Sequence, residues 1–264
     1  MLKIITLNLN GIRSAVKKGW LDWLATQDAD IACVQELKAQ AADLEQATRD
    51  ARGTMTGYFH YAEKKGYSGV GLYAKQPPER VCEGIGVAEF DVEGRYLRCD
   101  WPGLSVISLY VPSGSSSPER QAAKFRFMDV FYPQLQALHN EAKATGREFV
   151  ICADWNIAPT ARDLKNWKSN QKNSGFLPEE REWIERVQSE LGWVDVYRTL
   201  YPEAESEAYT WWSNRGQAWA KNVGWRIDYQ LATPGFAARA RAAHVFREAR
   251  FSDHAPLTIE YARP

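Results

Sequence analysis

The chain has 264 residues, of which 45% are hydrophobic and 25% charged, and its formal net charge is zero. This length and composition predict one α/β domain over residues 1–264, with a substantial core. Zero net charge excludes a protein that binds nucleic acid through its overall charge, although local basic pairs such as Lys17 with Lys18 and Lys64 with Lys65 are present.

No apolar stretch approaches the length of a membrane span, and Met1 leads directly into a strand-like segment without a signal peptide. The cysteines are scattered and form no Cys-x-x-Cys pair. We therefore expect no membrane association and a cytoplasmic location, nucleoid-associated in a prokaryote. We also expect reduced, mostly buried thiols at Cys33, Cys82, Cys99 and Cys152.

Apolar runs separated by Gly and Pro turns predict the strands of the first half of the chain. Between the first two runs, Trp20, Trp23 and Leu24 recur at helical spacing, which predicts a short amphipathic helix over about residues 16–26. The predicted strands span residues 4–9, 31–34, 58–62, 69–74, 96–101 and 104–109.

A long helix is predicted to begin after Ser117, whose hydroxyl can cap it, with Pro118 at the first helical position. Pro133 lies inside this helix and is expected to kink or split it. A second helix is predicted from Pro178 to Gly192. Strands outnumber helices and alternate with them irregularly, which indicates a layered α/β sandwich rather than a regular doubly wound sheet.

Several strand-like runs adjoin a carboxylate or a carboxamide. Strands that finish at the same edge of one packed sheet would bring these oxygens into a single cleft. Oxygen ligands suit a hard divalent cation such as Mg²⁺ or Mn²⁺, and a His beside an Asp then indicates a metal-assisted phosphoester hydrolase. The polar residues at these positions are Asn8, Asn10, Glu36, Asp154, Asn156, Asp228 and Asp253, the last followed by His254.

Some of these positions also have a simpler interpretation. Asp154 and Asn156 point the same way on an extended chain and suit a water and a phosphate oxygen, but Asp and Asn also commonly end strands in turns. His254 is more specific, since the chain has only 4 histidines and this one adjoins an Asp. The others are interpreted as surface or core-edge residues: His60, His139 and His244.

Seven motifs occur in order along the chain, within a similarity that extends over about residues 3–261. They are T-L-N-L-N-G-I-R, C-V-Q-E-L-K, G-Y-S-G-V-G-L-Y, S-L-Y-V-P-S-G, A-D-W-N-I-A, N-V-G-W-R-I-D-Y and F-S-D-H-A-P-L. On these motifs the chain resembles the exonuclease III family of apurinic/apyrimidinic endonucleases, within the exonuclease–endonuclease–phosphatase superfamily. The resemblance implies a four-layer α/β sandwich, with two packed mixed sheets flanked by helices and an active cleft at one edge.

The resemblance also implies a metal site and a catalytic set. Glu36 would be the principal ligand of Mg²⁺, for which Mn²⁺ would substitute. The other residues in or next to the metal shell would be Asn8, Asp154, Asn156 and Asp253. The catalytic residues would be Tyr110, Asp154, Asn156, Asp228 and His254.

Roles within that catalytic set follow from the same resemblance. Asp228 would orient His254, which touches the scissile phosphate together with Tyr110. Asp154 and Asn156 would place the attacking water. The family leaves two candidates for the base that takes the proton of this water, and we favour Asp154, with His254 stabilising charge on the phosphate.

Substrate contacts are implied in several parts of the chain, including the basic segment 162–172. Ser169 is small and would leave room for DNA to pass continuously through the cleft, as cleavage at an internal abasic site requires. The implied DNA-backbone contacts are Arg13, Lys18, Tyr67, Asn166, Asn170 and Asn173. The implied wall for a flipped abasic sugar consists of Trp211, Trp225 and Ile227.

The resemblance therefore predicts a Mg²⁺-dependent enzyme of base-excision repair. It would cleave 5′ to abasic sites in duplex DNA and also act as a 3′-phosphatase, 3′-phosphodiesterase and 3′–5′ exonuclease. The expected partner is double-stranded DNA with abasic or blocked 3′ ends, bound by a monomer. Two alternatives stay open: a non-catalytic nucleic-acid-binding regulator of the same fold, and a phosphatase acting on inositol phosphates or sphingolipids.

Four residues depart from the family pattern, of which Trp155 and Pro159 are local variants. Asn10 replaces an Asp found in some members, which removes one carboxylate from the metal region. Ser113 stands where many relatives have Asn or Gln. These departures bear on the number of metal ions and the balance of activities, and they leave the reaction class unchanged.

Overall fold

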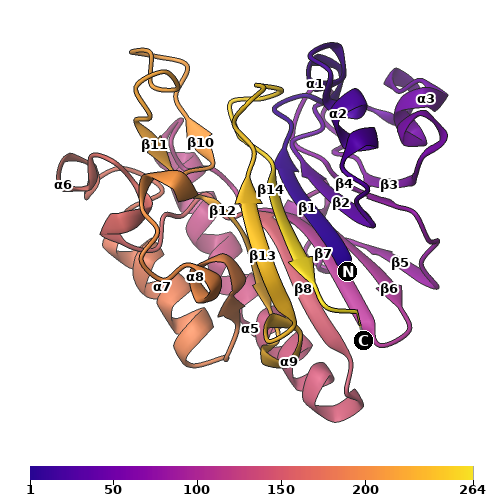
Figure 1. Ribbon diagram of the computed structural model, residues 1–264. Helices are drawn as coiled ribbons and strands as arrows, with labels where there is room; N and C mark the ends of the chain where they lie inside the picture. Colours follow the sequence, from indigo (N-terminus) through magenta and orange to yellow (C-terminus); the bar gives the residue numbers. More distant parts are fainter. Residues whose placement is uncertain (264) are drawn as a thin grey trace.

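Alternating side chains along the central strands build a core with two sides. In strand β1 (Leu2–Asn8), Ile4 packs between two sheets, whereas Ile5 and Leu7 pack on the opposite face. Both faces of this strand are covered, so most of its residues are buried. The computed structural model describes residues 1–263 (Figure 1).

The first sheet contains β1 at its centre and has the order β13-β14-β1-β2-β4-β3. Strands β1 and β2 are parallel and the other pairs are antiparallel, so the sheet is mixed. The bounds of its other strands are β2 (Ile31–Gln35), β3 (Thr56–His60), β4 (Val70–Ala74), β13 (Ala240–Val245) and β14 (Leu257–Tyr261).

The second sheet has the order β5-β6-β7-β8-β12-β9 and is also mixed, since β7 and β8 are parallel. Its strands are β5 (Arg80–Glu83), β6 (Tyr96–Trp101), β7 (Leu104–Tyr110), β8 (Glu148–Asp154), β9 (Val194–Asp195) and β12 (Asp228–Ala232). A separate two-stranded ribbon consists of β10 (Trp211–Trp212) and β11 (Gly224–Trp225).

Helices cover the outer face of each sheet. Helices α1 (Ile12–Lys17), α2 (Trp20–Thr26) and α3 (Gln46–Arg49) lie over the first sheet, and α5 (Pro118–Thr145) and α7 (Pro178–Ser189) lie over the second. This arrangement confirms the predicted four-layer α/β sandwich. The remaining helices are short: α4 (Ala88–Asp91), α6 (Trp167–Asn170), α8 (Val196–Leu200), α9 (Pro234–Ala237), and the 3₁₀ turns Ala41–Asp43, Ala51–Gly53, Ala161–Asp163 and Ser206–Ala208.

The long helix α5 corrects one prediction. It begins as expected, with the Ser117 hydroxyl accepting the N–H of Arg120 at 3.3 Å, but it continues without a break past Pro133. Pro133 and Asp129, whose carbonyl the proline leaves without a helical donor, are both exposed. Water can therefore satisfy that carbonyl, and the helix is not split.

The first predicted helix is also different in the structure. Residues 16–26 belong to two helices, because the chain turns between them at Gly19, whose φ of 90° lies in the left-handed region.

Among the cysteines, Cys33, Cys99 and Cys152 are buried thiols and Cys82 is half-buried. Among residues 1–263, no helix is both long and apolar enough to cross a membrane.

Candidate active site

The strand ends predicted to carry chemistry meet at one edge of the two sheets. The carboxyl ends of β1, β2 and β8 lie there together with the beginnings of the antiparallel strands β12 and β14. In the second sheet, Asp154 lies directly opposite both Asp228 and Tyr110 in the strand register. These ends enclose a pocket of about 340 Å³ whose lining includes Asn10, Glu36, Tyr110, Asp154, Asn156, Trp211, Trp225, Ile227, Asp253 and His254.

Left-handed backbone turns aim three of these side chains. Asn10, Glu36 and Asn156 have φ angles of 43°, 53° and 51°. Each follows the end of a strand, so the turn redirects the side chain toward the pocket instead of continuing the pleat. Such φ values are uncommon for residues other than glycine, although Asn adopts them more readily than Glu does.

Asp228 and His254 form a buried pair beside Asp154. The Asp228 Oδ2 lies 2.8 Å from Nδ1 of His254 and also accepts the Thr210 hydroxyl at 2.6 Å. The His254 Nε2 points toward Asp154, 3.9 Å from its Oδ2. The potential ligand atoms of Asp154, Asp228 and His254 all lie within 4.8 Å of one another, so these side chains can act on one small group.

The surroundings change the proton affinity of these groups. Burial, reinforced by the nearby Asp228 carboxylate, raises the pKa of Asp154 to about 7. Burial alone would lower the pKa of His254, but Asp228, Asp154 and Asp253 more than offset this and raise it to about 10. The site therefore holds a protonated imidazolium next to a carboxylate that can accept a proton near neutral pH.

The two asparagines of the first strand end fix the carboxylates. Asn8 is fully buried: its Nδ2 donates to Asp154 Oδ2, and its Oδ1 accepts the N–H of Asn10, both at 2.8 Å. Asn10 donates to Asp253 Oδ1 at 2.9 Å and accepts Lys38 Nζ at 2.5 Å. Asn8 thus fixes the orientation of the Asp154 carboxylate, and Asn10 links Asp253 to Lys38 across the pocket.

The charges of the pocket fit a hard divalent cation. Four carboxylates, those of Glu36, Asp154, Asp228 and Asp253, face the cations Lys38, 3.2 Å from Glu36, and His254. The buried Asp228 Oδ1 has no hydrogen-bond partner among the described residues. An excess of carboxylate charge with carboxamide oxygens nearby is the donor set that such cations prefer.

Arg95 packs against the Tyr110 ring, and the sequence patterns did not identify this residue. The Arg95 guanidinium is buried 4.7 Å from the centre of the Tyr110 ring and donates to the Tyr110 carbonyl at 3.1 Å. Arg95 and Arg120 both donate to the Tyr67 hydroxyl, at 3.0 and 2.7 Å. Lys38 was missed as well, because a lysine near a Glu in the sequence looks like surface charge until its partners in the fold are known.

The predicted sugar wall lies in the pocket. The rings of Trp211 and Trp225 meet edge to face, with centroids 6.2 Å apart, and Trp211 Nε1 donates to Asp253 Oδ2 at 3.2 Å. Ile227 lies beside them in the same lining. An apolar wall thus stands directly against a carboxylate that belongs to the acidic cluster.

The predicted DNA contacts outside the pocket fall into two groups. Around α6, Asn166, Ser169 and Asn173 are exposed, and both Ser169 Oγ and Asn170 Nδ2 donate to the Asn166 carbonyl. The other group contains the exposed Arg13 and Lys18 of the α1 region and the half-buried Tyr67. Arg13 lines a separate groove of about 800 Å³ with Lys17 and Lys38, and Lys38 connects this groove to the pocket.

Comparison with known proteins identifies the class. Residues 5–254 match the Endonuclease/Exonuclease/phosphatase family. The chain is 35% identical to the exodeoxyribonuclease of Bacillus subtilis over 98% of both proteins, and 36% identical to the DNA repair nuclease APEX1 of Danio rerio over 98% of this chain and 81% of that protein. The solved AP endonuclease of Archaeoglobus fulgidus superposes with a TM-score of 0.87 and 30% identity, covering 99% of both chains.

The chain therefore belongs to the endonuclease/exonuclease/phosphatase family, in its exonuclease III branch. It is a hydrolytic nuclease of the DNA-repair class. Both statements confirm the resemblance found in the motifs, and the fold agrees with them.

Proposed function

We propose that this protein hydrolyses the phosphodiester bond 5′ to an abasic site in duplex DNA, with Mg²⁺ as cofactor. We include 3′-phosphatase, 3′-phosphodiesterase and 3′–5′ exonuclease activity in the proposal, since all four reactions need a phosphoester at the same place. One observation carries the proposal: the acidic cluster around Asp154 and His254 shares its pocket with the aromatic wall of Trp211 and Trp225. Phosphoester chemistry and a small sugar are thereby accommodated side by side.

Glu36 would be the principal ligand of Mg²⁺, for which Mn²⁺ would substitute, with the other oxygens supplied by Asp154, Asn156, Asp253 and, beneath them, Asn8. When bound, the cation would neutralise negative charge that develops on the phosphate oxygens. Three carboxylates that line the pocket and the buried Asp228 beside it support this assignment, because they would otherwise repel one another.

The protein's own groups have distinct tasks in this proposal. Asp228 holds His254 through Nδ1, which leaves Nε2–H free to donate to a non-bridging phosphate oxygen. Asp154, with its pKa of about 7, takes the proton of the attacking water. Asn156, whose N–H donates to Asp154 Oδ1 at 2.9 Å, orients that water beside the base.

Tyr110 is proposed to lie near the leaving oxygen. Burial, followed by the Glu36 charge, holds the pKa of the Tyr110 hydroxyl well above its usual value, so it stays protonated and can donate a hydrogen bond. Removing one donor of this kind typically costs about 100- to 1,000-fold in rate.

DNA recognition is proposed to use both sides of the pocket. Trp211, Trp225 and Ile227 would receive a flipped abasic sugar and exclude a normal nucleotide by size. The exposed polar side chains of the α6 region and of α1 would contact backbone phosphates. They are Asn166, Ser169, Asn173, Arg13 and Lys18, together with the half-buried Asn170 and Tyr67. We further propose that the protein acts as a monomer in the cytoplasm, associated with the nucleoid in a prokaryote.

Neither alternative is favoured by a feature of the site. A non-catalytic regulator would have lost acidic or histidine groups, whereas Glu36 and His254 line one pocket and the buried Asp228 pairs with His254. A lipid or inositol phosphatase has no use for the exposed, Asn-rich α6 region. Cleavage of inositol phosphates in place of DNA would select that second alternative.

The activities can be separated by comparing two duplexes side by side, one with a single internal abasic analogue and one with a 3′-phosphate at a nick. We expect the wild type to process both with Mg²⁺. Ser169→His places a bulky ring where a continuous strand would pass, and should depress cleavage of the intact abasic duplex while sparing the nicked one. Ser189→His, at the exposed end of α7, is the matched control. Equal loss of both activities, or loss of neither, would contradict this role of Ser169.

A further inference from the structure

A buried ion pair lies directly behind the pocket and belongs to none of the groups discussed above. Lys124 of α5 and Glu180 of α7 are both 0% exposed, with Lys124 Nζ 2.7 Å from Glu180 Oε1. Withdrawing two charges from water is costly, and an apolar pair of similar volume would often be as stable. The contacts that this pair makes with the pocket therefore need an explanation beyond packing.

Lys124 reaches the turn that carries Asn156. Its Nζ donates to the Asn156 carbonyl at 2.7 Å. Asn156 has a left-handed φ of 51° and is also fixed by its N–H to Asp154 and its Nδ2 to the Val111 carbonyl, both at 2.9 Å. The lysine thus supplies the third tether of a residue that turns the chain in the left-handed region.

Glu180 holds the opposite segment of the pocket. Its Oε2 accepts the N–H of Gly175 at 2.6 Å and of Leu177 at 3.1 Å. Gly175 has a φ of 92°, and a Cβ at this position would lie 3.2 Å from both the Asn156 carbonyl oxygen and the Trp225 ring. The Asn156 turn, Gly175 and Trp225 are therefore in close contact. The ion pair holds the first two, since Lys124 bonds to Asn156 and Glu180 bonds to Gly175.

We propose that Lys124 and Glu180 are positioning residues for phosphoester cleavage: together they hold the backbone of Asn156 so that its side chain meets the water beside Asp154. This inference rests on the proposed function and adds a catalytic purpose to a pair that touches no substrate. The pair acts through Asn156, so its loss should lower turnover and leave DNA affinity almost unchanged.

The test uses the full chain and the abasic duplex. Lys124→Met alone leaves the buried Glu180 carboxylate without its cationic partner, so the informative variant is Lys124→Met with Glu180→Gln, which removes both charges. Circular dichroism and thermal melting establish that it is folded. We expect kcat to fall about 10- to 100-fold, while KM stays within about twofold.

A mutant cycle separates positioning from general destabilisation. In an Asn156→Ala background, the Lys124/Glu180 double substitution should lower kcat little further, because its target is already gone. The control Arg98→Met breaks the pairs of Arg98 with Asp100 and Glu141, none of which lines the pocket, and should lower the melting temperature without changing kcat.

An unchanged kcat in the folded double variant, or equal losses with and without the Asn156 side chain, would overturn the inference. A change confined to KM would overturn it too. The proposed function is judged separately by the wild type: if wild-type protein does not cleave the abasic duplex, the proposed function fails, whatever the variants show.

Discussion

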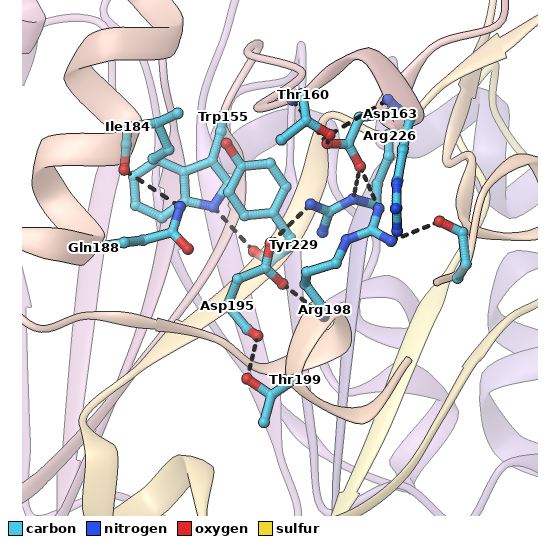
Figure 2. A network of polar contacts seen from close by, with 12 residues as sticks. Trp155, Thr160, Asp163, Ile184, Gln188, Asp195, Arg198, Thr199, Arg226 and Tyr229 are labelled. Atoms are coloured by element: carbon cyan, nitrogen blue, oxygen red, sulfur yellow. Dashed lines mark hydrogen bonds and ion pairs between the residues drawn. The ribbon is translucent and has the colours of Figure 1, made fainter. Parts of the chain in front are cut away.

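Two of the protein's clusters of buried charge differ in the balance between acidic and basic groups. In the first cluster, Asp163 Oδ1 accepts hydrogen bonds from the guanidinium groups of Arg226 and Arg198, both at 2.6 Å. Arg226 also donates to Asp195 Oδ2 at 2.8 Å (Figure 2). Each carboxylate there faces a guanidinium. In the second, the pocket, carboxylates outnumber cations, and one buried carboxylate oxygen of Asp228 has no partner among the described residues.

The two clusters therefore shift the pKa of a buried aspartate in opposite directions. Burial alone would raise the pKa of Asp163, but Arg226 and Arg198 more than offset it and hold the value below 3.8. In the pocket, burial and Asp228 raise the pKa of Asp154 to about 7. Buried charge by itself does not mark a functional site; an excess of one sign does, since that excess costs stability unless a ligand compensates it.

The largest effect is expected from Glu36→Gln. A neutral amide at this position binds a hard cation poorly, so metal-dependent cleavage should fall about 1,000-fold or more. The melting temperature without metal should not fall, because the substitution removes charge from an already acidic pocket. Initial rates across a Mg²⁺ titration measure this, and a wild-type rate at ordinary Mg²⁺ would refute the role of Glu36.

Asp163→Asn should be the reverse case, with a large loss of stability. The substitution leaves Arg226 and Arg198 partly uncompensated in the interior, which typically costs about 3 kcal/mol of unfolding free energy. Urea unfolding at pH 7 measures the loss. Because the folded pKa of Asp163 is depressed, its contribution is complete above pH 3.8 and is lost as pH falls below it, so wild type and variant should converge in acid.

Asp228→Asn should reduce turnover more than binding. The amide cannot hold the His254 imidazolium as the carboxylate does, and outer partners of this kind typically contribute about 10- to 100-fold. Single-turnover rates and a binding titration with abasic duplex separate the two quantities. Collapse of binding with a normal rate at saturating DNA would assign Asp228 to recognition instead.

The smallest expected effect is a pH dependence of the metal-free protein. Folding raises the pKa of Asp154 to about 7 and of His254 to about 10, so the folded state binds more protons than the unfolded state near neutrality. Stability in a chelator should therefore increase by about 1 kcal/mol or more from pH 8 to pH 6.5, before a divalent cation is added. If the free energy of unfolding measured in urea were the same or lower at pH 6.5 than at pH 8, the excess negative charge would already be balanced.

Local patterns predicted the fold well where one short segment decides its own structure. The strand predicted over 96–101 coincides with β6, and the cap at Ser117 begins α5. Patterns failed where the surroundings decide. The helix expected over 16–26 is divided at Gly19, and Pro133 leaves α5 whole because it faces water. Strands β5, β9 and β13 were not predicted, since pairing with distant strands creates them.

The site was predictable to the extent that its residues sit in recognisable motifs at strand ends. The pocket brings together Glu36, Asp154 and His254, which the motifs singled out. Arg95 and Lys124 could not be found in this way. Their significance depends on Tyr110 and Asn156, which lie in other parts of the chain and approach only in the folded protein.

The most direct test of the account is cleavage of a duplex that carries one internal abasic analogue, with the product ends mapped on a sequencing gel. The proposed function predicts one cut, 5′ to the analogue and leaving a 3′-hydroxyl, and the excess of carboxylates in the pocket predicts that this cut occurs in Mg²⁺ and not in EDTA. An intact duplex in Mg²⁺, or an equal cut in EDTA, would contradict it.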